Sequence, residues 1–273
     1  MSVASFLASG CGGTAESSSE RKVAASFYPL AYAAQELGGD SVDVVNLTPP
    51  GTEPHDLEPA PSDVRELQSA DLVLLLGHGF QPQLEDAAGS GDTVVDLLDT
   101  PGLNRFANGD PHVWLDPVRY ELIARRIGDK LGAMSSVPRF VTRLESLDRQ
   151  YRRGLARCAR DDIVTSHEAF GYLAQRYRLH QIPITGLSPE AEPSPKDLSR
   201  VIGLIRSTHA TTVFFETLVS PRIAKAVASD TGARTAVLNP IEGLEPSEAK
   251  SGEDYFSLMR SNLASLRAAL GCR

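Results

Sequence analysis

The sequence predicts an α/β protein with two four-stranded parallel-sheet lobes joined by a long helix, and two observations lead to this fold class. Short segments rich in Val and Leu alternate with amphipathic segments of helical period, which is the order of elements in parallel sheets. The alternation occurs twice, once on each side of a long helical stretch. We therefore expect an N-terminal segment over residues 1–21, a first lobe over 22–132, a linking helix over 133–158 and a second lobe over 159–273.

The first lobe is expected to contain four buried strands, since each candidate is short and apolar. These strands are Lys22–Phe27, Val42–Thr48, Leu72–Gly77 and Thr93–Leu98. The helices between them are expected at Leu30–Leu37, Ser62–Ala70 and Gln81–Ala88. Ser62 is the expected N-cap of its helix, and Asp116 followed by Pro117 marks the start of a further helix that runs to about Leu131.

The linking helix is expected to begin near Val137 and to end near Cys158, because apolar residues recur there at spacings of three and four. Its other face is charged, which is typical of a solvated surface. The strands expected in the second lobe are Asp162–Ser166, Ile182–Gly186, Thr211–Glu216 and Arg234–Asn239. Its expected helices are Ala169–Tyr177, Pro195–Thr208, Ser220–Thr231 and Tyr255–Leu270.

The composition is that of an ordinary soluble globular protein of 273 residues, of which 41% are hydrophobic and 23% are charged. The 27 Lys and Arg against 35 Asp and Glu give a net charge of −8, with no basic block. This balance argues against nucleic acids and anionic membrane surfaces as partners and favours a cationic small ligand. Beyond residue 20, the longest strongly apolar run is Leu72–Leu76, far shorter than the ~20 residues that cross a bilayer.

The N-terminal sequence MSVASFLASGC is apolar, is rich in small residues, and precedes a polar stretch rich in Gly and Ser. It is similar to a bacterial lipobox, in which Cys11 receives the lipid and the polar stretch is a flexible tether. The charged beginning of a signal segment is missing, so we expect the natural start to lie further upstream. If Cys11 is lipidated, Cys158 and Cys272 remain in an exported chain, and we expect them to form a disulfide; two buried thiols are the alternative.

Three of the six histidines follow predicted strands. His55 lies in the loop after the second strand, His112 follows the fourth, and His167 ends the first strand of the second lobe. Glu216 ends the third expected strand of the second lobe, and Glu242 follows the fourth. Because open α/β sheets bind ligands beyond the carboxyl ends of their strands, we expect these side chains to converge in the groove between the lobes. Surface or capping roles are expected for the other histidines: His78, His180 and His209.

Such a group of side chains is suited to a divalent transition metal. Imidazole nitrogens with one or two carboxylate oxygens are typical ligands of these metals, and four such ligands in a tetrahedron suit Zn(II). The histidines are far apart in the chain, which excludes a zinc finger. The sequence therefore predicts a metal site assembled between the two lobes.

Six segments resemble the zinc/manganese-specific substrate-binding proteins of bacterial ABC uptake transporters, over residues 22–270. They are GTEPHDLEP, DPHVWLDP, VTSHEAFGYLAQRY, SPEAEPSPKDL, FFETLVSP and GEDYFSLMRSNLASLRAAL. The resemblance implies two α/β lobes joined by one long rigid helix, with the metal in the cleft between them. It also implies that His55 and His112 are ligands, and that His167 takes a third position where zinc binders have His and manganese binders have Glu.

The fourth ligand position departs from the commoner pattern of that family. Much of the family has Asp in a Leu-Asp-Pro segment, where this chain has Asn239. Relatives with the Asn-Pro-hydrophobic-Glu-Gly form use the Glu, so the resemblance assigns Glu242. A carboxylate also offsets the charge of Zn(II) bound to three neutral histidines, whereas Asn239 offers only a carbonyl dipole. Glu216 is the rival carboxylate, and a place behind a histidine would suit it better.

The resemblance implies an extracytoplasmic receptor that binds Zn(II) and delivers it to the permease subunit of an ABC transporter. The lipid on Cys11 would be its only attachment to the membrane, and we expect a monomer that has no enzymatic activity and binds no nucleic acid. A manganese receptor of the same family and a surface adhesin that keeps its metal for structure are alternatives. A zinc hydrolase fits less well, because His167-Glu168 is not followed by the second His of the HExxH motif and a fourth protein ligand would close the site.

Overall fold

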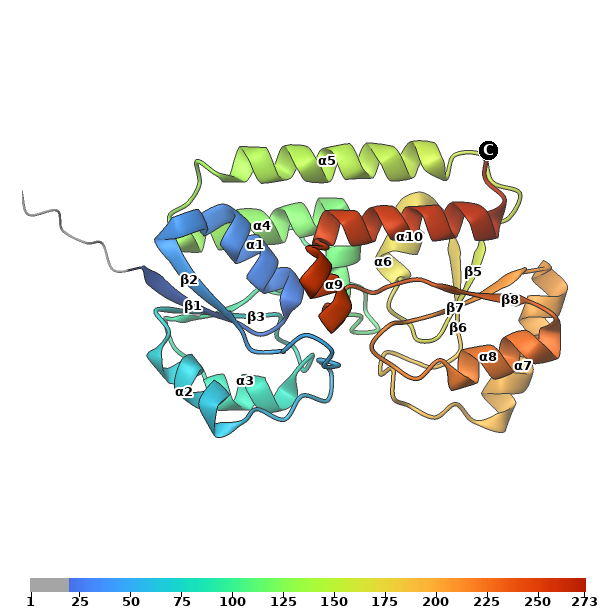
Figure 1. The fold of residues 1–273 in the computed structure, drawn as a ribbon, viewed down its shortest axis with the longest axis horizontal. Helices are drawn as coiled ribbons and strands as arrows, with labels where there is room; N and C mark the ends of the chain where they lie inside the picture. The colour runs from blue at the N-terminus through green and yellow to red at the C-terminus, as the bar shows by residue number, and fades with distance from the viewer. Residues whose placement is uncertain (1–19) are drawn as a thin grey trace, which may run out of the picture.

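Two α/β lobes lie side by side in the computed structural model, which describes residues 20–273 (Figure 1). The strands are β1 (Arg21–Ala25), β2 (Val42–Asn46), β3 (Leu72–Leu75), β4 (Val94–Asp96), β5 (Asp162–Thr165), β6 (His180–Pro183), β7 (Thr212–Phe215) and β8 (Arg234–Val237). The α-helices are α1 (Tyr28–Gly38), α2 (Pro61–Ser69), α3 (Pro82–Ala88), α4 (Pro117–Leu131), α5 (Val137–Gly154), α6 (Gly171–Tyr177), α7 (Pro195–Thr208), α8 (Arg222–Thr231), α9 (Pro246–Ser251) and α10 (Tyr255–Leu270). Two short 3₁₀ helices are η1 (Gly39–Ser41) and η2 (Val113–Leu115). Cys11 lies outside the described residues, and within them no helix combines the length and the apolar character that crossing a membrane requires.

Each lobe is built on one four-stranded parallel sheet, which confirms the predicted fold class. The strand order is β2-β1-β3-β4 in the first sheet and β6-β5-β7-β8 in the second. In the first sheet Val23 pairs with Val44 on one side and with Leu72 on the other. In each sheet the chain begins in an inner strand, β1 or β5, and continues to the edge strand on one side, β2 or β6. It then crosses to the two strands on the other side, β3 and β4 or β7 and β8. This reversal of strand order leaves room for a ligand at the carboxyl edge of each sheet.

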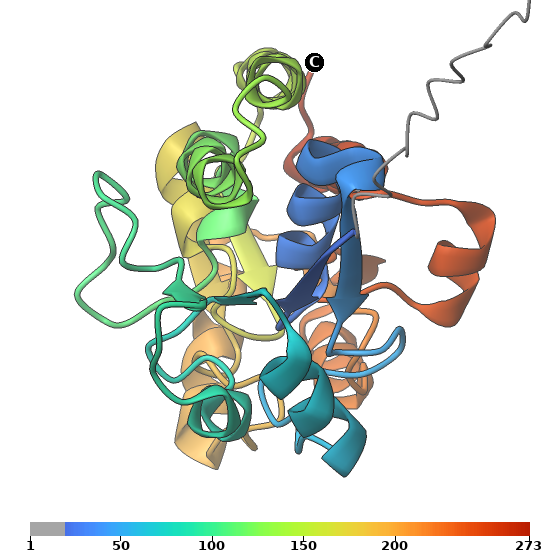
Figure 2. The same ribbon diagram turned by 90° about the vertical axis from the view of Figure 1, so that its left-hand side faces the viewer.

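A helix layer, formed by α4, α5 and α10, covers both lobes. In Figure 1, α5 runs above the two lobes, and Figure 2 shows it as an outer layer over α4. Helix α5 packs on α4 of the first lobe and on α10, which follows the second. Its apolar side chains are buried, and the hydroxyl of Tyr151 donates to the carbonyl of Met259 on α10 at 2.6 Å. The spacing of three and four in the sequence therefore identifies the face of α5 that packs inward.

The prediction that one long helix alone joins the lobes is not confirmed. Helix α5 ends at Gly154 rather than near Cys158. In addition, α10 packs against the first lobe, because the hydroxyl of Tyr255 donates to the carbonyl of Trp114 at 2.6 Å and its ring lies 4.6 Å from that of Tyr120. One continuous core of buried residues extends from β1 to α10. Several packed helices therefore connect the lobes.

A disulfide between Cys158 and Cys272 ties the segment after α5 to the end of the chain, as expected from the cysteine count. Beside it, the backbone N–H groups of Ala159 and Arg160 both donate to the carbonyl of Leu270, at 3.0 and 3.2 Å. The disulfide and these hydrogen bonds fix the ends of α5 and α10 to each other.

Most elements differ from the sequence expectation by one to three residues at their ends, and three differences have a clear physical reason. Helix α2 begins at Pro61 and its N-cap is Ala60, because the carboxylate of Asp63 accepts from the backbone N–H of Ala60 at 2.7 Å; Ser62 lies inside the first turn. Strand β6 begins earlier than expected, since His180 already pairs with β5. Helix α9 was not expected, because it has only six residues and lies in a polar stretch.

Candidate metal centre

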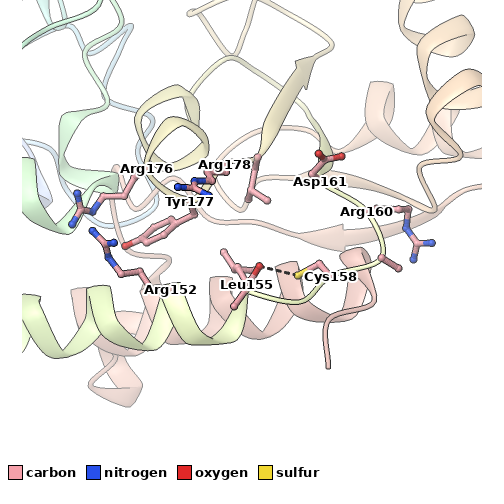
Figure 3. A pocket seen from close by; sticks show the side chains of 11 residues that line it. Arg152, Leu155, Cys158, Arg160, Asp161, Arg176, Tyr177 and Arg178 are labelled. Atoms are coloured by element: carbon pink, nitrogen blue, oxygen red, sulfur yellow. Dashed lines mark hydrogen bonds between the residues drawn. The ribbon is translucent and has the colours of Figure 1, made fainter.

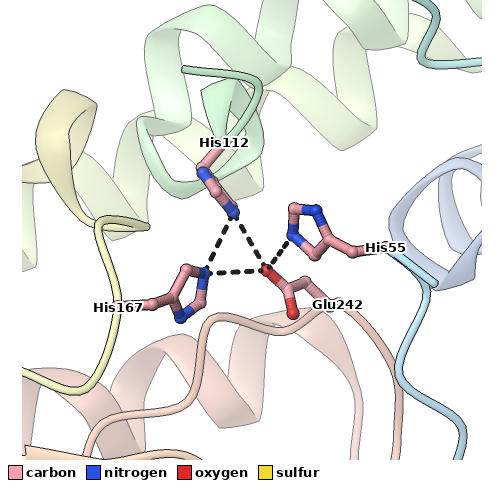
Figure 4. A group of neighbouring side chains, drawn as sticks. All are labelled: His55, His112, His167 and Glu242. Carbon is pink, nitrogen blue, oxygen red and sulfur yellow. Dashed lines mark hydrogen bonds and ion pairs between the residues drawn. The ribbon is translucent and has the colours of Figure 1, made fainter. Parts of the chain in front are cut away.

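Three histidines and one glutamate come together between the lobes (Figure 4). His55 lies in the loop between β2 and α2, and His112 directly precedes η2. His167 follows β5, and Glu242 lies in the loop after β8. Each residue offers one ligand atom, and the four atoms all lie within 4.8 Å of one another. The parallel topology therefore brings together residues from four loops that are far apart in the sequence.

The Oε1 atom of Glu242 faces all three imidazoles. It lies 3.0 Å from Nε2 of His112, 3.4 Å from Nε2 of His55 and 3.5 Å from Nε2 of His167. The Nε2 atoms of His112 and His167 are 3.3 Å apart. Ligands at ~2.0–2.1 Å from a tetrahedral zinc ion are about 3.3–3.4 Å from one another, because the edge of a tetrahedron is about 1.63 times its radius. These four distances, 3.0–3.5 Å, are close to that spacing.

The group is almost completely shielded from water. The side chains of His112 and His167 are 0% exposed and that of Glu242 is 2% exposed, while His55 is 11% exposed. Burial disfavours the charge of Glu242, but hydrogen bonds from the three histidines outweigh it and hold the pKa of this carboxyl well below its usual range. Burial also disfavours protonation of His167, but Glu216 and Glu242 outweigh it and raise the pKa of His167 to about 10. Without metal, protons therefore supply the positive charge that this buried carboxylate needs.

Two further carboxylates orient the imidazoles from behind. Oδ1 of Asp110 lies 2.8 Å from Nδ1 of His112, and Oε1 of Glu216 lies 2.7 Å from Nδ1 of His167. Each carboxylate lies on the Nδ1 side of its ring, so Nε2 is the nitrogen that faces Glu242 and would bind a metal once it carries no proton. Asp110 also accepts from the backbone N–H of His112 at 2.9 Å, and the hydroxyl of Ser166 donates to Glu216. Both rings are thereby fixed in the orientation that a metal ligand needs.

Packing orients His55, which is the most exposed of the four residues. Its ring lies edge-on to that of Phe80, with centroids 4.6 Å apart, and Phe80 in turn packs on Trp114. The loop that contains His55 also contacts the second lobe, because the N–H of Gly51 donates to the carbonyl of Leu244 at 2.8 Å. The first-lobe loop and the loop of Glu242 are therefore hydrogen-bonded to each other.

The structure separates Glu242 from the two rivals for the fourth position. Glu216 contacts Nδ1 of His167, on the side of the ring that faces away from the group. The side-chain oxygen of Asn239 accepts from the N–H of Ile241 at 2.7 Å, so it is occupied within its own turn. The geometry thus agrees with Glu242 in the group, Glu216 behind a histidine, and Asn239 capping the turn.

Sequence reasoning missed two residues of this region. Asp110 gave a usable signal, because a carboxylate two residues before His112 is within reach of the imidazole. Glu53 gave none, since it lies in a loop rich in Pro and Gly where burial is not expected. It is nevertheless partly buried, and this burial together with the charge of Glu242 raises the pKa of Glu53 to about 8.

The other three histidines lie outside the group, as expected. His78 is exposed and its Nε2 lies 2.8 Å from Oδ1 of Asp99. His209 ends α7 with a φ of +55°, and His180 is an exposed residue at the start of β6. Surface and capping positions account for them.

A pocket of about 560 Å³ lies beside the disulfide rather than at the metal centre (Figure 3). Asp148 pairs with two of the arginines that line this pocket, at 2.9 Å and 2.8 Å, and so neutralises part of its charge. The arginines of the lining are Arg152, Arg160, Arg176 and Arg178. The pocket shares no residue with the metal centre.

Comparison with known proteins identifies the family to which this sequence is similar. The model of a family described as zinc-uptake complex component A, periplasmic (ZnuA), matches residues 23–269. The high-affinity zinc uptake system protein ZnuA of Bacillus subtilis (strain 168) is 31% identical over 300 residues, which cover 97% of this chain and 94% of that relative. The zinc-binding protein AdcA of Streptococcus pyogenes serotype M1 is 31% identical over 284 residues, which cover 90% of this chain and 55% of AdcA. The chain thus spans about half the length of this second relative.

A solved structure shares the fold. The Zn(II)-bound ZnuA-like domain of Streptococcus pneumoniae AdcA superimposes with a TM-score of 0.78 at 32% identity, covering 92% of this chain and 99% of that one. The family match spans both lobes, and the residues of the metal centre all lie within it. The chain therefore belongs to the ZnuA family of periplasmic zinc-uptake components.

Proposed function

We propose that this protein is an extracytoplasmic receptor that binds Zn(II) and delivers it to the permease subunit of an ABC transporter. One observation carries the proposal: three imidazole nitrogens and one carboxylate oxygen lie together between the lobes, at a spacing close to that of a tetrahedral zinc site. Membership of the ZnuA family supports the transport role. A cargo ion needs a site that excludes water while the ion is held and that opens by movement of loops, and a site formed by loops of two lobes meets both needs.

In this proposal Zn(II) is the cargo, held by Nε2 of His55, His112 and His167 and by one oxygen of Glu242. Each lobe supplies two of the four ligands, so the ion closes the contact between them. The carboxylates behind the rings, Asp110 and Glu216, raise the basicity of the imidazoles and reduce the net positive charge of the loaded site.

Zinc is expected to be preferred to manganese, because three imidazoles and one carboxylate form a softer ligand set than two imidazoles and two carboxylates. Changing His167→Glu is therefore expected to shift the preference toward manganese. Competitive titration of the purified variant and the unchanged protein with both metals measures this shift. An unchanged ratio of affinities would remove His167 from the explanation of selectivity.

The cellular setting is part of the same proposal. The similarity of the N-terminal sequence to a lipobox supports a lipid on Cys11, which would anchor the receptor to the outer face of the plasma membrane or hold it in the periplasm. We propose that it acts as a monomer, because the metal centre is complete within one chain.

Two alternative functions, a zinc hydrolase and an adhesin with a structural metal, differ from a receptor in how the metal is coordinated and exchanged. Four protein ligands leave no open position for the water that a zinc hydrolase activates, so we propose binding without catalysis. An adhesin that keeps its metal for structure would not exchange it. Exchange of bound zinc with a chelator within minutes is expected for the receptor, and a zinc ion that leaves only on unfolding would favour the structural role.

The deciding experiment is elemental analysis of the purified protein, followed by competitive titration of the metal-free form with zinc and manganese. We expect one bound zinc per chain and a lower affinity for manganese. A protein that carries neither metal and binds neither in titration would contradict the proposed function.

A further inference from the structure

The segment that carries Glu242 is held in place by a side chain from α10. The side-chain oxygen of Asn262 accepts from the backbone N–H of Asn239 at 2.8 Å. Its side-chain nitrogen donates to the backbone carbonyl of the same residue at 2.6 Å. Asn262 thus pairs with one backbone unit as a neighbouring strand would, at the point where the chain leaves β8.

Both residues of this pair are buried, so their hydrogen bonds contribute to the free energy that holds the segment in place. Asn262 is 2% exposed and Asn239 is 4% exposed. On α10, Asn262 lies on the same inward face as Leu258, Met259 and Leu266, which are all buried apolar residues. A polar side chain in that apolar stripe costs free energy unless its hydrogen bonds are made, and both are made to the segment of Glu242.

The next residues of the segment have an unusual backbone. Ile241, which directly precedes Glu242, has a φ of +58°. This region of φ is unfavourable for a β-branched residue, and such a conformation persists only where the surroundings enforce it. The side chain of Asn239 supplies one restraint by accepting from the N–H of Ile241 at 2.7 Å. The indole N–H of Trp114 supplies another by donating to the carbonyl of Pro240 at 2.7 Å.

We propose that Asn262 is a positioning residue for the metal centre: it holds Asn239, and through it the strained turn at Ile241, so that the carboxylate of Glu242 faces the three histidines. The inference rests on the proposed zinc-binding function and names a residue of α10 that contacts none of the four ligands in the hydrogen-bond network. Without Asn262, the turn relaxes to a negative φ at Ile241 and the carboxylate loses its fixed place opposite the imidazoles.

The test compares two substitutions on α10 in the full chain. Asn262→Leu keeps the number and branching of the side-chain heavy atoms but removes both hydrogen bonds to Asn239. Leu266→Ala, one turn further along α10, removes buried apolar contacts and leaves those hydrogen bonds intact. Zinc affinity is measured by competition with a chelator, the coordination geometry by the visible absorption of the cobalt(II)-loaded protein, and stability by urea unfolding of the metal-free form.

Asn262→Leu is expected to lower zinc affinity by ~10–100-fold, the range seen when a residue behind a metal ligand is lost, and to change the cobalt spectrum. Leu266→Ala is expected to lower stability while keeping the affinity and the spectrum of the unchanged protein. The inference is overturned if Asn262→Leu keeps both, or if Leu266→Ala shows the same losses. Should Asn262→Leu not fold, Asn262→Asp decides the question with the same readouts, because it keeps an acceptor for the N–H of Asn239 but removes the donor to its carbonyl. Absence of zinc binding in the unchanged protein would instead contradict the proposed function itself.

Discussion

At the scale of single residues, the histidines are contacted by carboxylates on two different sides of their rings. Glu242 faces the Nε2 atoms, whereas Asp110 and Glu216 face the Nδ1 atoms of their partner rings. In the proposed zinc site, the carboxylate of Glu242 would contribute an oxygen to the metal, and each of the other two would fix the tautomer and orientation of a nitrogen ligand. The two roles predict different costs of mutation.

Glu242→Gln is therefore expected to weaken zinc binding more than Glu216→Gln or Asp110→Asn does. The first substitution removes the only anionic ligand, while the other two are expected to cost ~10–100-fold in affinity. Chelator competition on the three purified variants ranks them. A larger loss in Glu216→Gln than in Glu242→Gln would transfer the fourth-ligand assignment to Glu216.

Zinc affinity is also expected to rise steadily with pH. In the metal-free protein, Asp110 and Glu242 outweigh burial and raise the pKa of His112, and Glu216 and Glu242 raise that of His167 to about 10, so protons compete with zinc for these rings. Zinc must displace those protons because an imidazolium has no lone pair for the metal, so affinity falls as pH is lowered and continues to rise above pH 7. Calorimetric titration at several pH values, in buffers of different ionisation enthalpy, measures both the affinity and the protons released. Equal affinity at pH 5 and pH 7.5 would contradict ligation by histidine.

The three histidines of the site were predictable, because each follows an apolar strand and the carboxyl ends of parallel strands share an edge. The choice among Glu242, Glu216 and Asn239 was not. It depends on the path of the chain after β8, and above all on the positive φ of Ile241, which no residue pattern indicates. Asn262 was hidden for a similar reason, since its partner is a backbone group and not a side chain.

Among the elements, helices and strands with strong periodicity were predicted well and their ends less well. The inner strands β1, β3, β5 and β7 follow apolar segments of the sequence, since both faces of the sheet are covered there, whereas the edge strand β8 is largely exposed. The boundaries of α5 and β6 depend on tertiary partners: α5 ends at Gly154, and β6 extends to His180 because β5 offers a partner there. The role of α10 in joining the lobes could not be seen in its own amphipathic pattern.

The disulfide belongs to this scale, because it joins the ends of α5 and α10. Replacing Cys158 and Cys272 by Ser is expected to lower the free energy of unfolding by ~2–4 kcal/mol, since the bond closes a long loop in the unfolded chain. Urea unfolding of the variant and of the oxidised protein measures the difference. Zinc affinity serves as the control and is expected to stay unchanged, because neither cysteine contacts the metal centre. Coincident unfolding curves would show that the bond contributes no stability.

Across the whole molecule, the lobes share one core and meet again at the metal centre. Trp114 connects these two regions: its ring packs on Phe27 at 4.8 Å and lies 5.2 Å from the ring of His112. Its indole N–H reaches across to the carbonyl of Pro240 in the second lobe. With the lobes fixed by the helix layer, we expect metal loading to rearrange the loops around this side chain and to leave the lobes in place.

Because Trp114 is the single tryptophan of the chain, its fluorescence should report zinc binding directly. Zinc bound to His112 would change the charge beside the indole and fix the segment to which the indole is hydrogen-bonded, so the intensity or wavelength of emission is expected to change and to saturate at one zinc per chain. A chelator should reverse the change, while a large shift of the far-ultraviolet circular dichroism is not expected, since the helix layer does not move. Glu242→Gln is the matched control, because at the same zinc concentration it should leave the emission of Trp114 unaltered. Emission that is indifferent to zinc in the unchanged protein, while titration shows the ion bound, would mean that the metal is held away from His112 and Trp114.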